Sequence, residues 1–262
     1  MTLLGIIASS KLVAPTAPVA GYKAWYDASD TATITVSGSN VTQWNDKSAN
    51  GLNLVQATGA KQPLSGTRTQ NGLNMIDFDG TNDVLSSNAA ASAWKFLTDA
   101  TGSTVFVAMF VDTASDSRVI FDVANGSIAN VASYSWLINS DDTGNFGKGT
   151  DNPSGYSWFI SATNQTFSDN AAQTWSVVSD PTNATAANRV KIYKNLSLDS
   201  TTNSQTGTSS TSNPAQPLNV GGYVNYSDSF DGGICEILIY DSILSAGDVS
   251  DNQSYLANKW GV

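Results

Sequence analysis

The chain of 262 residues contains no histidine, a single cysteine, Cys235, and a single glutamate, Glu236. Without histidine, neither a Ser-His-Asp nor a Cys-His catalytic arrangement can form, and histidine-based zinc sites are excluded as well. One cysteine cannot make a disulfide within the chain or supply a cysteine zinc site. The residue types alone therefore exclude several common kinds of enzyme and metal site.

Charge is also scarce, because only 13% of the residues are charged, against about 25% in a typical soluble domain. Lys and Arg together number 12 and Asp and Glu together number 22, which gives a net charge of −10. Nucleic acids and anionic membrane surfaces are bound through clustered Lys and Arg, so the balance disfavours both partners. The polar remainder is mostly Ser, Thr, Asn and Gly, as in many extracellular and virion-surface β-proteins.

Long apolar runs are missing too, since no stretch approaches the roughly 20 apolar residues of a membrane span. The N-terminal segment 1–10 has a short apolar run without the preceding basic residues of a secretory signal. We expect it to be an assembly arm, with a terminal strand of the same domain as the alternative. The arm would make contact through four apolar side chains: Leu3, Leu4, Ile6 and Ile7. Residues 1–20 are thus the arm and a Pro/Ala linker, and one domain spans 21–262.

From residue 21 onward, short apolar or alternating runs recur between Asp-Gly, Asn-Gly, Gly-Gly and Asn-Pro turn signals, which predicts an all-β domain. Besides the strands, the sequence predicts a helix at 89–97, a long polar loop or an irregular hairpin at 197–217, and a C-terminal helix. The predicted strands are 22–26, 33–36, 74–78, 104–111, 118–123, 134–138, 156–160, 175–178, 189–193, 218–220 and 234–240.

The C-terminal helix has the clearest local signals. Ser245 is its predicted N-cap, and Asp248 stands at the third helical position, where it can complete a capping box. The buried stripe is predicted from residues spaced by seven and four: Val249, Leu256 and Trp260.

Several segments are similar to the sequence motifs of one known family. They are Ala24–Asp30, Val41–Gly51, Ile76–Asp83, Thr174–Val178, Lys191–Asn195, Leu218–Gly222 and Phe230–Ser245. Together they resemble the laminin-G-like, concanavalin A-like lectin and glucanase jelly roll of the type found in phage and bacterial surface proteins. The resemblance spans about 22–262 and implies an antiparallel two-sheet jelly-roll sandwich with a short C-terminal helix. It implies no activity, because this fold is shared by lectins, hydrolases, adhesins and virion proteins.

Glycoside hydrolysis is the enzymatic option that the resemblance suggests, and it requires two carboxyl groups at one bond. The related glucanases carry their acids on a Glu-x-Asp-x-x-Glu strand, which a chain with one glutamate cannot match. Glu236 has no acidic residue two, three or four positions further on, so we interpret it as a structural carboxylate. An Asp pair elsewhere is the remaining enzymatic alternative. We expect no catalytic residues and a chain that is not an enzyme.

Calcium is the one cofactor that the sequence suggests, since members of the family often bind it at the rim of the sandwich. Four residues could supply hard oxygen ligands: Asp77, Asp79, Asn82 and Asp83. The alternative is a turn without metal, in which these side chains cap their own backbone.

Glycan binding would use exposed aromatic faces beside polar groups. The residues predicted at a ligand rim lie in one loop: Tyr223, Asn225 and Tyr226. A Tyr-rich turn or a subunit contact is the alternative for this loop. Four tryptophans fall in the family's core motifs and are expected in the core: Trp25, Trp44, Trp175 and Trp260.

These observations predict a virion structural protein, either a phage capsid decoration protein or a tail or fibre component. It would attach through the arm to other virion proteins or to copies of itself, with a host-surface glycan as a further partner. The alternative is a bacterial or viral carbohydrate-binding adhesin module in an extracellular or cell-surface location. A glycan hydrolase is the least favoured interpretation.

Overall fold

The computed structural model describes residues 16–114, 117–124, 132–149, 158–202, 204–205, 208–224 and 228–262. In these residues the chain is mostly β and ends in one α-helix, α1 (Ala246–Trp260). The strands are β1 (Ala24–Asp27), β2 (Ile34–Ser37), β3 (Asn40–Trp44), β4 (Leu54–Val55), β5 (Leu64–Gln70), β6 (Leu73–Asp79), β7 (Leu85–Ser87), β8 (Ser103–Val111), β9 (Arg118–Asp122), β10 (Tyr134–Ile138), β11 (Thr143–Gly149), β12 (Trp158–Thr166), β13 (Ala171–Ser179), β14 (Val190–Lys194), β15 (Ser197–Thr201), β16 (Ser204–Gln205), β17 (Asn219–Val220) and β18 (Asp231–Tyr240). Short 3₁₀ helices occupy Thr31–Thr33, Gly59–Lys61, Ala91–Leu97 and Ala186–Asn188.

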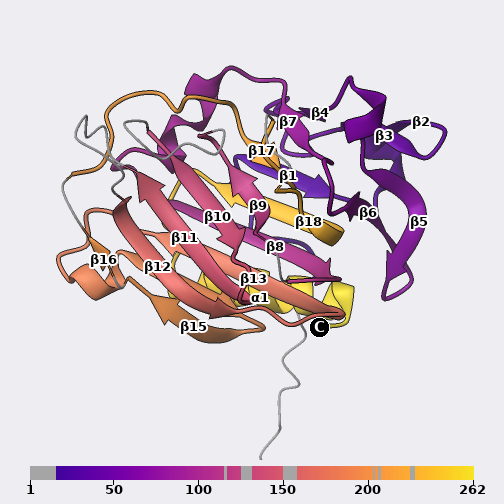
Figure 1. The fold of residues 1–262 in the computed structure, drawn as a ribbon. Coiled ribbons are helices and arrows are strands. Elements are labelled where there is room, and N and C mark those ends of the chain that lie inside the picture. The colour runs from indigo at the N-terminus through magenta and orange to yellow at the C-terminus, as the bar shows by residue number, and fades with distance from the viewer. Residues whose placement is uncertain are drawn as a thin grey trace, which may run out of the picture.

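Hydrogen bonds join these strands into one continuous sheet that folds over its own core (Figure 1). One layer contains β9 to β12, and the other has β18, β8 and β13 at its centre. The layers are linked along one edge by a chain of paired strands that runs from β18 through β6, β5, β3, β4, β7 and β17 to β9. At the other edge β12 lies close to β14 and β15. The prediction of two separate sheets is therefore corrected to a single, nearly closed antiparallel sheet. Pairing along the first edge satisfies backbone groups that two open sheets would leave exposed.

The space between the layers is filled by aromatic and branched side chains. Trp136 of β10 meets Trp175 of β13 edge to face, with ring centroids 6.1 Å apart, and Phe167 stacks on Trp175 at 4.4 Å. Such offset and edge-to-face pairs stabilise a core beyond the area that they bury. Trp44 and Trp175 are buried here, which confirms the core prediction for both.

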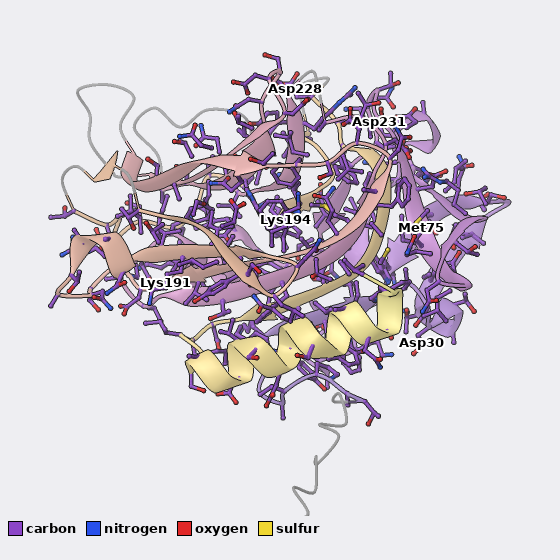
Figure 2. All side chains as sticks on the ribbon, turned by 90° about the horizontal axis from the view of Figure 1, so that it is seen from below. Asp30, Met75, Lys191, Lys194, Asp228 and Asp231 are labelled. Atoms are coloured by element: carbon purple, nitrogen blue, oxygen red, sulfur yellow. The ribbon has the colours of Figure 1, made fainter. Side chains whose placement is uncertain are left out.

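A second apolar cluster lies on the opposite face of β8, β13 and β18, where α1 packs (Figure 2). Val249, Leu256 and Trp260 are all buried in it, so the predicted stripe of the helix is confirmed. The cap is confirmed as well, because the Ser245 hydroxyl accepts a hydrogen bond from the backbone N–H of Asp248 at 3.1 Å. Helix α1 has 15 residues. Among the described residues, no helix is long and apolar enough to cross a membrane.

The structure refines two local predictions. The predicted helix at 89–97 is a 3₁₀ helix, Ala91–Leu97. For 197–217 the irregular hairpin is the better of the two alternatives, because Ser197–Thr201 pairs with β14 with a shift of register, and the short strand Ser204–Gln205 follows. Strand β15 is half to fully exposed along its length, so it lacks the apolar alternation by which strands are recognised.

Candidate functional site

The site begins with an irregularity in strand β18. One extra residue, Cys235, stands between the paired positions Ile234 and Glu236. Ile234 faces the core between the layers, whereas Cys235 belongs to the cluster beneath α1. Because a bulge shifts the alternation of side chains, Glu236 faces the helix instead of the core.

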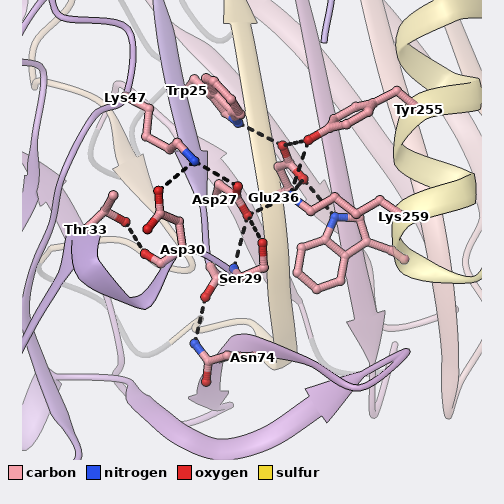
Figure 3. A network of polar contacts seen from close by, with 12 residues as sticks. Trp25, Asp27, Ser29, Asp30, Thr33, Lys47, Asn74, Glu236, Tyr255 and Lys259 are labelled. Carbon is pink, nitrogen blue, oxygen red and sulfur yellow. Dashed lines mark hydrogen bonds and ion pairs between the residues drawn. The ribbon is translucent and has the colours of Figure 1, made fainter. Parts of the chain in front are cut away.

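Glu236 is fully buried and accepts four hydrogen bonds at the helix interface (Figure 3). Its Oε1 accepts from the Trp25 indole N–H and from the Tyr255 hydroxyl, each at 2.8 Å. Its Oε2 accepts from the Lys259 ammonium at 2.7 Å and from the Trp260 indole N–H at 2.9 Å. Burial raises the pKa of Glu236, while Lys259 and the indole of Trp260 act in the opposite direction. This carboxylate fastens α1 to β1 and β18.

Asp27, at the end of β1, forms the second centre of the network. It accepts hydrogen bonds from Lys259 at 2.8 Å, from Lys47 at 3.0 Å and from the Ser29 hydroxyl at 2.6 Å. Burial acts to raise the pKa of Asp27, but the bonds from Lys259, Ser29 and Lys47 outweigh it and hold that pKa below its ordinary value. Lys47 also pairs with Asp30 at 2.8 Å, so two lysines and three carboxylates share one network.

An open groove of about 440 Å³ lies beside this network, where the start of the described chain passes α1. Its lining includes three apolar or aromatic side chains and three polar ones: Pro18, Trp25, Tyr255, Thr16, Asn258 and Lys259. Asp27 also lines the groove. Thr16 and Asn258 are exposed and Trp25 is half-buried, whereas Tyr255 is only 5% exposed and its hydroxyl is bound by Glu236. The groove therefore joins aromatic surface to polar groups, several of them fixed by the network.

Trp25 is the residue that sequence reasoning placed wrongly. Expected in the core, it is half-buried on the outer face of the sheet and lines the groove. Ala24 and Tyr26 face the core, so strand alternation directs Trp25 and Asp27 outward. The signal was present in the sequence, because Asp27 lies two positions from Trp25 and therefore on the same face of the strand, and an acidic residue indicates that this face does not belong to the apolar core. The Lys47 ammonium lies 4.3 Å from the centre of the Trp25 ring.

The predicted ligand rim lies elsewhere. Tyr223 is buried, with 9% of its surface exposed, and burial raises its pKa to about 12. Asn225 and Tyr226 lie outside the described residues. The same is true of the four arm residues, Leu3, Leu4, Ile6 and Ile7. Both sets stay predictions, and the structure does not bring Tyr223 to the groove beside α1.

The four predicted calcium ligands lie at the end of β6 and in the turn that follows. Asp77 pairs with Arg68 at 2.7 Å. Asp79 accepts a hydrogen bond from the backbone of Thr81 at 2.8 Å, and Asp83 accepts one from the backbone of Asp79 at 3.0 Å. Asn82, the fourth predicted ligand, lies in the turn, where its backbone N–H also donates to Asp79 at 3.3 Å. Burial, followed by the charges of Asp79 and Asp77, raises the pKa of Asp83 to about 6. Among the described residues, no group of three or more acidic or cysteine side chains is placed to hold a metal.

Comparison with known proteins shows a shared fold. No family model matches the sequence, and no curated protein matches it. Trypanosoma rangeli sialidase is similar at a TM-score of 0.56 and 11% identity, over 92% of this chain and 33% of the sialidase. The receptor-binding domain of botulinum neurotoxin type G has a TM-score of 0.55 and 10% identity, over 80% of this chain and 48% of that domain. The binding domain of botulinum neurotoxin serotype D has a TM-score of 0.53 and 11% identity, over 89% of this chain and 50% of that domain.

The chain thus spans a third to a half of the structures that it resembles, and the likeness shows a shared β-domain fold. It also overturns the prediction that the chain is not an enzyme, because sialidases stand among the similar structures. The match covers only about a third of each sialidase, at about 10% identity. What is matched is a fold that these enzymes share with receptor-binding domains, so the fold itself decides neither way.

Proposed function

We propose that this chain is a carbohydrate-binding domain and that the groove beside α1 is its binding site. The observation that supports this most directly is the placement of Trp25 and Tyr255 in one groove with Thr16, Asn258 and Lys259. A sugar ring presents an apolar face of C–H groups and a rim of hydroxyls. Aromatic surface beside a few oriented polar groups is the arrangement that suits such a ligand.

The network behind the groove supports the proposal by fixing its aromatic walls. The Trp25 indole N–H and the Tyr255 hydroxyl both donate to Glu236 Oε1 at 2.8 Å. Rings held in this way do not have to be ordered when a ligand binds, which lowers the entropic cost of association. The fold adds indirect support, since the similar structures include a sialidase in complex with sialic acid and two toxin receptor-binding domains.

The finer assignments rest on the sequence motifs. We propose membership of the laminin-G-like, concanavalin A-like group and a place on a virion surface, with attachment through residues 1–20 to virion proteins or to other copies of the chain. An adhesin module at an extracellular or cell surface is the alternative. The apolar arm favours the first, and deletion of residues 1–15 tests it. Loss of self-association or of particle attachment would support the virion role, and an unchanged assembly would contradict it.

Glycan binding is tested by applying the full chain to a glycan array and measuring the hits by calorimetry. Arms with calcium and with a chelator test the predicted cofactor in the same experiment. Trp25→Ala should weaken binding about tenfold, because stacking and the burial of the ring are lost. Trp25→Phe keeps a ring and should retain most of the affinity.

Tyr193→Ala is the matched control, since it removes a half-buried aromatic side chain from β14, outside the groove lining. Its affinity should equal that of the wild type. Thermal melts establish that each variant is folded. Absence of any bound glycan with or without calcium, or wild-type affinity in folded Trp25→Ala, would overturn the proposal.

A further inference from the structure

We infer that the groove selects uncharged saccharides and rejects acidic ones such as sialic acid. The inference rests on the proposed function and narrows its ligand class. It follows from where the hydrogen-bond donors of the two lysines point, since a ligand carboxylate needs a cation or a free donor to replace its water.

Lys259 lines the groove, but its donors are already used. An ammonium group has three N–H donors. Those of Lys259 have three acceptors: Asp27 Oδ1 at 2.8 Å, Glu236 Oε2 at 2.7 Å and the Tyr255 hydroxyl at 3.2 Å. A ligand carboxylate could bind Lys259 only by displacing one of these partners, two of which are buried carboxylates.

Lys47 is engaged in the same way. Its ammonium pairs with Asp27 at 3.0 Å and with Asp30 at 2.8 Å, and it lies over the ring of Trp25. The network thus sets two ammonium groups against the carboxylates of Asp27, Asp30 and Glu236, in a chain with a net charge of −10. An acidic sugar would meet no excess of positive charge here and would lie near Asp27.

The groups left for a ligand are neutral. Asn258 and Thr16 are exposed at the groove, and no hydrogen bond of either side chain is found within the described residues. An amide and a hydroxyl both donate and accept, as sugar hydroxyls require. With the half-buried Trp25 as apolar surface and the edge of Tyr255 behind it, the groove matches the chemistry of an uncharged sugar ring.

The test uses matched glycan pairs, in which a neutral core is compared with the same core carrying a terminal sialic acid or uronic acid. We expect the bound glycans to be neutral and the acidic extension to weaken binding at least tenfold. An acidic glycan that binds as tightly as its neutral core would overturn this inference while leaving carbohydrate binding intact. Absence of every glycan from the bound set would overturn both.

Asp27→Asn provides the complementary test, because it removes one negative charge and leaves Lys259 and Lys47 short of an acceptor. The ratio of acidic to neutral affinity should rise about tenfold in this variant. Asp251→Asn makes the same charge change at an exposed position of α1 outside the groove lining and should leave the ratio unchanged. If Asp27→Asn does not fold, Asp30→Asn frees Lys47 and should raise the ratio by a smaller factor. An unchanged ratio in the folded variant would overturn the inference.

Discussion

Leu196 is a residue under local strain. It has a φ of +71° and follows Asn195, with a φ of +45°, in the two-residue connection between β14 and β15. Turns of this kind favour Asn followed by Gly, because a side chain in the left-handed region costs about 1–2 kcal/mol. The Leu196 side chain is also 51% exposed, so its packing contributes little stability to offset this strain.

We therefore predict that Leu196→Gly raises the free energy of unfolding by about 1 kcal/mol. Urea denaturation of the two proteins measures it. Leu198→Gly is the control, because Leu198 is equally exposed but lies in extended β15, where glycine should lower stability. A loss of stability in Leu196→Gly would show that the side chain, and not the backbone strain, dominates at this turn.

At the scale of elements, the sequence predicted what local signals determine. The cap at Ser245 and the stripe through Val249 and Trp260 were found because every signal lies within one helix. The outward direction of the Glu236 side chain was not predicted, because it depends on a bulge that is defined by the pairing of β18 with β8. The bulge at Cys235 leaves no local mark in an apolar strand, and the whole network around Glu236 follows from it.

Glu236 should stabilise the contact between α1 and the sheet. Glu236→Gln would direct an amide N–H₂ toward groups that all donate and would leave Lys259 with less negative charge beside it. Breaking a buried ion pair typically costs about 3–5 kcal/mol, and we expect a loss of about 3 kcal/mol in denaturant unfolding.

The matched control is Asp241→Asn, because Asp241 is a more exposed carboxylate whose contact with Lys23 is 3.7 Å long. It should change stability by less than about 0.5 kcal/mol. A loss below about 1 kcal/mol for Glu236→Gln would mean that the carboxylate does not hold the helix in place.

At the scale of the whole molecule, the groove exists only when two distant parts of the chain meet, because 16–18 and β1 line it on one side and α1 lines it on the other. Glu236 of β18 does not line the groove, but it binds Trp25 of β1 and both Tyr255 and Lys259 of α1. The all-β class and the packed C-terminal helix could be predicted from the strand pattern and the helix signals, whereas the closure of the sheet could not. The groove could not, because no local pattern joins residues that are more than 200 positions apart. The location of this groove therefore follows from tertiary contacts and not from the sequence pattern of any one segment.

The stability of the whole molecule should also depend on pH through Lys148. This lysine of β11 is fully buried, and its ammonium donates to the backbone oxygen of Asp99 at 2.7 Å. Burial lowers its pKa from 10.5 to about 7. Above pH 7 the unfolded chain therefore holds a proton that the folded protein has released. Stability should rise with pH in this window, by up to about 1.4 kcal/mol per pH unit, whereas below pH 7 the folded protein bears the full cost of the buried charge.

We expect the unfolding free energy of the wild type to increase between pH 7 and about 7.5, below the range in which Cys235 ionises in the unfolded chain. Lys148→Met replaces the ammonium by an apolar group of similar length, so it should abolish this slope and stabilise the protein most at pH 7. Lys191→Met, at a half-buried position of β14, should retain the wild-type slope. Equal slopes in Lys148→Met and the wild type would show that another group controls the pH dependence, since the buried amine is the only ionisable group that this substitution removes.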